Sequence, residues 1–234
     1  MTVFGILIVG HICAGTIGLL SFWMPVVLRK GSPDHIKWGR IFAKAIYAAA
    51  TIACIIGVLN LTTESDRHPV MRDRALFAGL FGWMMIYLGL LSLLLVRYGI
   101  AAVVNKRTPA RNRDAMSLGW LALVGVSGLI CGVQGVILAQ PLMVALALLG
   151  LIAVGTFARA ALWPRADRTA YLAEHIKAMV AAGISAYTAF LSVGLLRIVP
   201  EQVFNPLVWA VPSVIGVMLI IHHLRMLPQR SLNT

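Results

Sequence analysis

The sequence has few charged residues and very few acidic ones. Only 12% of its 234 residues are charged, and 8 Asp and Glu stand against 20 Lys and Arg. Soluble domains carry about 25% charged residues and about 45–50% apolar ones, whereas this chain is 60% hydrophobic. A soluble globule of this composition would expose large apolar patches. The composition therefore argues against a soluble enzyme and against a disordered chain.

Paired cysteines and the common hydrolytic motifs are absent as well. The three cysteines, Cys13, Cys54 and Cys131, each stand alone in an apolar run. Without a Cys-x-x-Cys pair, the sequence indicates neither a disulfide framework nor a thiolate metal site. It also lacks Gly-x-Ser-x-Gly, His-Glu-x-x-His and a glycine-rich phosphate loop. No carboxylate falls inside an apolar run, which argues against a proton-coupled carrier or pump.

The sequence does contain long apolar runs, each close to the ~20 residues that a helix needs to cross a bilayer. We predict an all-α fold, a polytopic membrane bundle of seven transmembrane helices in a single domain, 1–234. We interpret the first run as a retained helix because it has no basic region before it. The predicted spans are 3–28, 41–62, 75–96, 117–138, 142–162, 175–196 and 207–226.

The basic residues indicate the orientation of these helices. Of the 20 Lys and Arg, 16 fall at one set of alternate ends and 4 at the other. Because cytoplasmic loops are enriched in Lys and Arg, we predict an outer N-terminus and a cytoplasmic C-terminus. The basic residues form short clusters between apolar runs, so we expect no nucleic-acid partner. The segment Tyr98–Val104 either extends the third helix or lies along the membrane interface.

One histidine, His11, falls well inside the first apolar run. An ionisable group in hydrocarbon is expensive to bury, so its side chain should face the protein. Gly15 and Gly18 share its helical face and would allow close approach of a helix or a flat ligand. His11 is therefore either an axial heme or metal ligand, or a neutral imidazole hydrogen-bonded across helices, for example to Gln134.

Four more histidines fall near the cytoplasmic boundary. We expect His223 rather than its neighbour His222 to face inward, because it shares a face with a glycine and a proline. Two imidazoles at one depth can ligate a heme iron, so His35 with His175, or His175 with His223, are the pairs we expect. The alternative is that these are interfacial histidines bonded to carbonyls or lipid.

Two further patterns concern how the helices associate. The segment 34–37 reads Asp-His-Ile-Lys and 174–177 reads Glu-His-Ile-Lys, which indicates a repeated helix pair. Glycines follow one face of the fourth span at spacings of 3, 4 and 3, which predicts close helix packing, or else room for a porphyrin or a lipid tail. These glycines are Gly125, Gly128, Gly132 and Gly135.

The histidine motifs resemble those of a known group of proteins. The motifs are His11-x-x-x-Gly15, then Arg29-Lys30-Gly31, then His35-x-x-x-Gly39-Arg40, and later His175-x-x-x-Met179. They resemble a large group of bacterial inner-membrane proteins that share a domain of unknown function. The resemblance implies a multi-helix bundle in the bacterial inner membrane with recurring histidines, and it implies no reaction.

Three functions follow as hypotheses. The first is a redox protein that holds heme b through histidines, with His11, His35, His175 and His223 as candidate ligands, and exchanges electrons with a quinone or another redox partner. The second is a carrier or channel for a small apolar or anionic solute. The third is a non-catalytic subunit that binds another membrane protein through the glycine stripe.

Overall fold

The computed structural model describes residues 2–62, 73–163, 169–191 and 206–227. These residues are almost entirely helical, and seven of their helices are 20 residues or longer once α3, η2 and α4 are counted as one continuous helix. The elements are α1 (Val3–Val27), α2 (Pro33–Thr62), α3 (Arg74–Phe77), the π-helical segment η2 (Ala78–Trp83), α4 (Met84–Val104), the short 3-10 helix η3 (Pro109–Arg113), α5 (Ala115–Ile137), α6 (Pro141–Leu162), α7 (Ala170–Ala189) and α8 (Pro206–Arg225).

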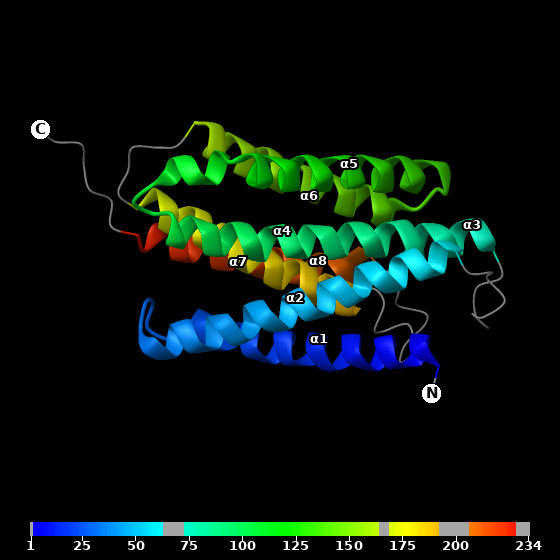
Figure 1. Ribbon diagram of the computed structural model, residues 1–234, viewed down its shortest axis with the longest axis horizontal. Helices are drawn as coiled ribbons and strands as arrows, with labels where there is room; N and C mark the ends of the chain where they lie inside the picture. The colour runs from blue at the N-terminus through cyan, green and yellow to red at the C-terminus, as the bar shows by residue number, and fades with distance from the viewer. Residues whose placement is uncertain (1, 63–72, 164–168, 192–205, 228–234) are drawn as a thin grey trace, which may run out of the picture.

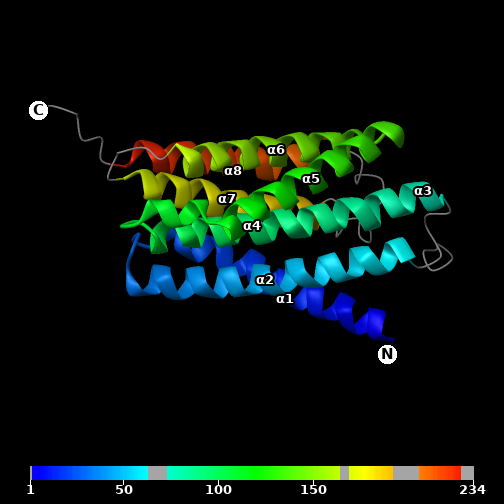
Figure 2. The ribbon, with the colours of Figure 1, turned by 45° about the horizontal axis from the view of Figure 1, so that its top comes forward.

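The long helices lie roughly side by side and run from one end of the molecule to the other (Figures 1 and 2). Helices α1 and α2 form one side of the bundle, and α5 and α6 form the opposite side. Between them α4 packs on α2, α5 and α7, and α8 packs on α7. The predicted all-α bundle is therefore confirmed.

The outside of this bundle is apolar. Val3, Leu20 and Val27 on α1 are each more than 70% exposed. Five helices in the described residues are long and apolar enough to span a membrane, namely α1, α2, the continuous helix from Arg74 to Val104, α5 and α6. Exposed apolar surface of this extent is stable only in lipid. The chain thus has the architecture of a multi-pass integral membrane protein.

The helices do not coincide with the predicted spans. Helix α2 starts at Pro33, well before residue 41, and the third helix continues to Val104 instead of ending at 96. Tyr98–Val104 is thus an extension of the third helix. Hydropathy marks only the part of a helix that crosses the hydrocarbon, and these helices project beyond it. Residues 192–196 of the sixth predicted span lie outside the described residues.

The third helix contains a π-helical segment near its beginning. Between Ala78 and Trp83 the backbone takes the wider π turn, in which hydrogen bonds join residues five apart rather than four. The amide of Asn60, buried on α2, donates a hydrogen bond of 2.9 Å to the carbonyl oxygen of Phe81 in this segment. This bond supplies a partner for the π segment and joins α2 to the third helix.

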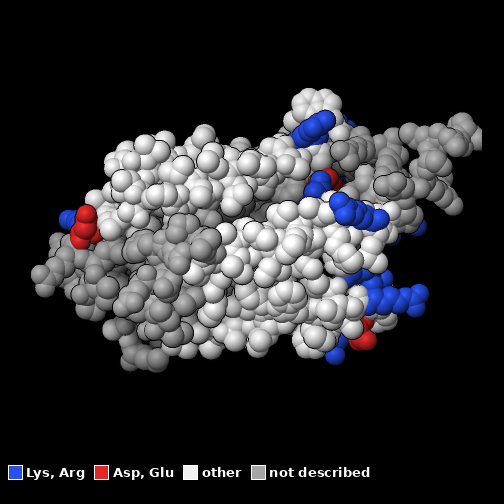
Figure 3. Space-filling model, turned by 180° about the vertical axis from the view of Figure 1, so that it is seen from behind, with Lys and Arg blue, Asp and Glu red and all other residues white. Residues whose placement is uncertain are grey.

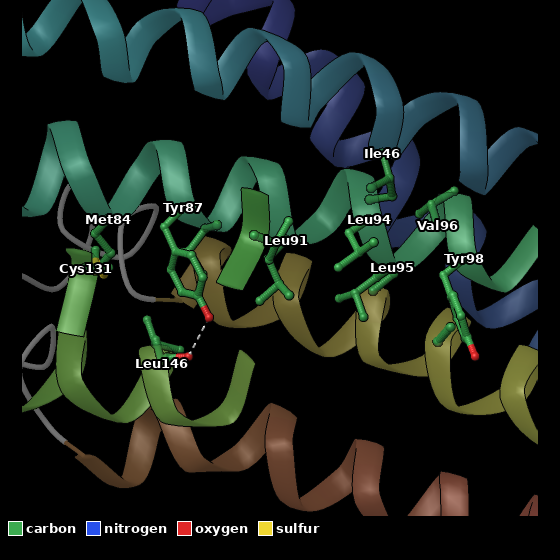
Figure 4. Close-up of a cluster of buried hydrophobic side chains, with 14 of the residues drawn as sticks. Ile46, Met84, Tyr87, Leu91, Leu94, Leu95, Val96, Tyr98, Cys131 and Leu146 are labelled. Atoms are coloured by element: carbon green, nitrogen blue, oxygen red, sulfur yellow. Dashed lines mark hydrogen bonds between the residues drawn. The ribbon is translucent and has the colours of Figure 1, made fainter. Parts of the chain in front are cut away.

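Tyr87 on α4 points toward Leu146 within the buried hydrophobic cluster (Figure 4). Its side chain is 1% exposed, and its hydroxyl donates to the carbonyl oxygen of Leu146 on α6 at 3.1 Å. A Cβ atom placed on Gly150 would lie 1.7 Å from that hydroxyl oxygen. Only glycine therefore fits at position 150, and the contact fixes the distance between α4 and α6.

Lys and Arg side chains gather at one end of the bundle (Figure 3). The α1–α2 connection, the η3 segment and the end of α8 all lie at this end (Figure 1). We call it the charged end. This distribution matches the alternation of basic clusters along the sequence. The charged end is therefore the end suited to contact with water at the membrane surface.

Candidate functional site

His11 lies on α1 and bonds to the neighbouring helix α2. Its Nδ1 atom is 2.9 Å from the carbonyl oxygen of Ala49. Gln134, the partner that the sequence suggested, lies on α5, on the other side of the bundle, and that expectation is wrong. The true partner is a backbone carbonyl, which any residue type provides.

His35 makes the equivalent bond at the charged end. It lies in the first turn of α2, and its Nδ1 atom is 3.1 Å from the carbonyl oxygen of Pro25 in the last turn of α1. Lys30 donates to the same carbonyl oxygen at 2.9 Å and to that of Val26. The last carbonyls of a helix have no partner within the helix, so these two side chains cap α1. Partial burial lowers the pKa of the Lys30 amine.

His175 lies in the second turn of α7 and bonds to α4. Its Nδ1 atom is 2.8 Å from the carbonyl oxygen of Gly99. The preceding residue, Glu174, accepts a hydrogen bond of 3.2 Å from the hydroxyl of Tyr98 and forms an ion pair with Lys177. The start of α7 is therefore fixed against α4 by two polar contacts.

These three histidines share one protonation pattern. A carbonyl oxygen can only accept, so each Nδ1 atom carries the proton and donates it. Each Nε2 atom of the neutral ring then keeps a free lone pair. This is the arrangement of many metal-ligating histidines, whose second nitrogen donates to a carbonyl that fixes the ring. In the histidines at positions 11, 35 and 175, Nε2 is thus the ring atom that remains for a metal.

The charged end brings several of the histidines together. His175 interacts electrostatically with His35 although 140 positions separate them in the sequence. Lys30 interacts electrostatically with both His35 and His223. The Nε2 atom of His223 is buried without a hydrogen-bond partner, whereas His222 is exposed. We call His35, His175, His223 and Lys30 the basic cluster.

The repeated helix pair suggested by the two similar tetrapeptides is absent from the described residues. His35 bonds to α1, the helix that precedes its own, and α1 and α2 pack closely. His175 bonds instead to α4, and α7 packs mainly on α4 and α8 and not on the preceding helix α6. The two segments share local chemistry, with a histidine donating to a neighbouring helix, but not a common supersecondary unit.

The glycine stripe of α5 faces α6 and Tyr87. A Cβ on Gly128 would lie 3.0 Å from the Tyr87 ring, one on Gly132 would lie 3.2 Å from Ala147, and one on Gly135 would lie 2.8 Å from Met143. Gly125 has more room, with its nearest neighbour at 3.8 Å. The stripe lies against protein atoms along α6, so it lets α5 and α6 approach closely.

An apolar cavity between α1, α7 and α8 had no recognisable signal in the sequence. Its volume is about 140 Å³, and Phe22, Trp23 and Tyr187 form part of its wall. The indole N–H of Trp23 donates to the hydroxyl of Tyr187 at 2.7 Å, and that hydroxyl donates to the carbonyl oxygen of Leu19 at 2.9 Å. Every polar atom of this aromatic pair is therefore occupied.

The described residues contain no group of three or more His, Cys, Asp or Glu side chains placed to hold a metal ion. A site built from three or four protein ligands is thus not formed in this part of the chain. Comparisons with protein-family models, with curated proteins and with solved structures give no match. The fold and the site define a multi-pass membrane protein with a histidine-rich basic cluster at one end.

Proposed function

We propose that this protein is a redox protein of the bacterial inner membrane that binds heme b through His35 and His175. The observation that carries the proposal is the pairing of these two rings. They come from distant parts of the chain, interact electrostatically at one end of the bundle, and each donates Nδ1–H to a carbonyl. Each ring therefore offers an Nε2 lone pair at the charged end of the bundle.

Two histidines meet the ligand requirement of a heme iron but not that of a bare metal ion. A bare ion usually needs three or four protein ligands, and the described residues hold no such group. A heme iron needs only two axial ligands, and neutral imidazole is a common one. A bound heme would supply one-electron transfer within the membrane.

The other histidines are less suitable as ligands. His11 bonds to Ala49 toward the opposite end of the bundle, so it differs in depth from His35 and His175. His223 interacts with Lys30 and His222. The two chosen rings have their orientation fixed by the carbonyls of Pro25 and Gly99, which is the role of outer-shell partners in heme and metal sites.

A reduced-minus-oxidised absorption spectrum tests this proposal. The full chain is expressed in heme-replete cells and purified in detergent. We expect a Soret band that is lost in His175→Ala and His35→Ala and retained in the matched control His11→Ala. Absence of the band in the wild type, or its full retention in both His35→Ala and His175→Ala, would overturn the proposal.

A further inference from the structure

The cavity between α1, α7 and α8 is suited to hydrocarbon. Its wall is wholly apolar and includes Phe22, Gly183, Val211 and Leu219. The hydrogen-bonding groups of Trp23 and Tyr187 are occupied by each other and by Leu19, so the wall has no polar group that requires a partner. The space is partly open at the surface, and its volume is comparable with that of an apolar cavity that holds a benzene-sized group, that is, about six carbon atoms.

Two basic side chains, Lys30 and His223, lie about one helical turn from this cavity, toward the charged end. His223 is four residues beyond Leu219 on α8, which corresponds to about 6 Å along the helix. Lys30 bonds to the carbonyls of Pro25 and Val26, which follow Phe22 within about one turn of α1. These two side chains are close enough for the Lys30 charge to act on His223.

Both groups retain capacity to bind an anion. The Nε2 atom of His223 is buried and has no hydrogen-bond partner, which is an unfavourable state for a polar atom. The ammonium of Lys30 has three N–H donors, of which the two carbonyls use two, and its side chain is exposed. A phosphate oxygen would provide a charge-assisted partner for these atoms.

We propose that α1, α7 and α8 form a binding site for one anionic phospholipid of the leaflet at the charged end. A segment of its acyl chain occupies the cavity, and its phosphate binds Lys30 and His223. Basic pockets between transmembrane helices on the cytoplasmic side are suited to such headgroups, and the chain's net charge of +12 favours an anionic lipid over a zwitterionic one. This site does not depend on heme.

The experiment compares two lipids on the purified full chain. Native mass spectrometry counts bound lipid, and thermal unfolding in detergent follows stability, after addition of phosphatidylglycerol or phosphatidylcholine with identical acyl chains. We expect one tightly retained phosphatidylglycerol and a higher melting temperature with that lipid alone. Glycerol phosphate, which has the anion without the chains, should give no stabilisation.

Two variants test the two halves of the site separately. Lys30→Gln should weaken phosphatidylglycerol binding by about fivefold, because one basic group is lost at the headgroup. Val211→Trp fills the cavity and should displace the acyl chain while leaving the basic groups in place. Arg111→Gln is the matched control, since it removes one exposed positive charge at the same end but away from the cavity.

Each variant is compared with itself in phosphatidylcholine, so a general loss of stability cancels. Equal binding of the two lipids would overturn the proposal. So would an effect of Arg111→Gln as large as that of Lys30→Gln, which would indicate nonspecific attraction. Undiminished binding to well-folded Val211→Trp would overturn the placement of the chain, as would stabilisation by glycerol phosphate alone.

Discussion

His11 and His35 join the same two helices in opposite directions. His11 reaches from α1 to the carbonyl of Ala49 on α2, and His35 reaches from α2 to the carbonyl of Pro25 on α1. Positions 11 and 25 are separated by about 21 Å along α1. Two bonds at different positions along α1 therefore hold this helix, the least buried of the five candidate membrane spans in the described residues, against α2.

This relationship predicts the effect of removing either ring. His11→Phe removes one interhelical hydrogen bond and should lower the free energy of unfolding by about 1 kcal/mol. The loss should add to that of His35→Phe, because the two sites are too far apart to couple. Thermal unfolding of the purified single and double variants checks both values. A double variant no less stable than either single variant would contradict additivity and show that the two bonds act as one unit.

The contact between Tyr87 and Gly150 predicts a strong steric effect. Gly150→Ala places a methyl group against the Tyr87 hydroxyl and should destabilise the bundle by about 1–3 kcal/mol. Gly155→Ala, on the same helix but with open space around it, should be neutral or slightly stabilising. The measurement is the melting temperature in detergent.

A second substitution tests whether the loss of stability in Gly150→Ala comes from the collision with Tyr87 or from the replacement of a glycine as such. Tyr87→Phe removes the hydroxyl that collides with the new methyl group, so the double variant Tyr87→Phe, Gly150→Ala should recover part of the lost stability. The single variant Tyr87→Phe should itself lose about 1 kcal/mol, since the bond to Leu146 disappears. No recovery in the double variant would place the damage elsewhere.

The charged end predicts the orientation in the membrane. Arg111→Cys places a thiol at the charged end, and Ala139→Cys places one in the α5–α6 turn at the opposite end. A membrane-impermeant maleimide should label Ala139→Cys in intact spheroplasts and Arg111→Cys only after permeabilisation. The wild type is the control, because its three cysteines lie within helices. The reverse labelling pattern would show the opposite orientation.

Asp114 predicts a pH-dependent contribution to stability. Its carboxylate caps α5 and accepts a 2.7 Å hydrogen bond from the backbone N–H of Ser117. Hydrogen bonds from Ser117 lower the pKa of Asp114 below its ordinary value. A lowered pKa means stability that is present above the unfolded pKa, about 3.9, and lost as the pH falls through the folded value.

The variant Asp114→Asn isolates this contribution, because asparagine also caps helices but does not titrate. At pH 7 the variant should be equal to the wild type or slightly less stable. Any difference should shrink as the pH falls below about 4. The measurement is the melting temperature of both proteins across that range. A difference that stays constant with pH would contradict a role for the ionised carboxylate.

Sequence patterns predicted the helical bundle, and they predicted that His223 rather than His222 faces inward on α8. Both predictions depend only on the chemistry of the side chains. Apolar runs give the helices, and the glycine and proline beside His223 identify its buried face. The hydrogen-bond partners of His11 and His175 could not be predicted from such patterns, because both rings bond to backbone carbonyls, which every residue carries. The cavity could not be predicted either, because it depends on how α1, α7 and α8 are arranged in space.

The ends of the helices were also predicted only in part from the sequence. The apolar run that begins at 41 marks where α2 enters the hydrocarbon, but α2 itself begins at Pro33, with Ser32 accepting a hydrogen bond from the N–H of His35. This polar first turn is what places His35 beside Pro25. The candidate histidine site thus depends on a helical segment that hydropathy does not reveal.

The π-helical segment Ala78–Trp83 determines which neighbours the rest of its helix can face. A π turn contains about one residue more than an α turn. A chain one residue shorter here would continue as an ordinary α-helix, and the two halves would be rotated by about 100° relative to each other. Tyr87 would then turn away from Gly150, and Asn60 would lose its carbonyl. A single inserted residue therefore keeps both ends of this long helix in register, and a deletion here would be far more disruptive than one in a loop.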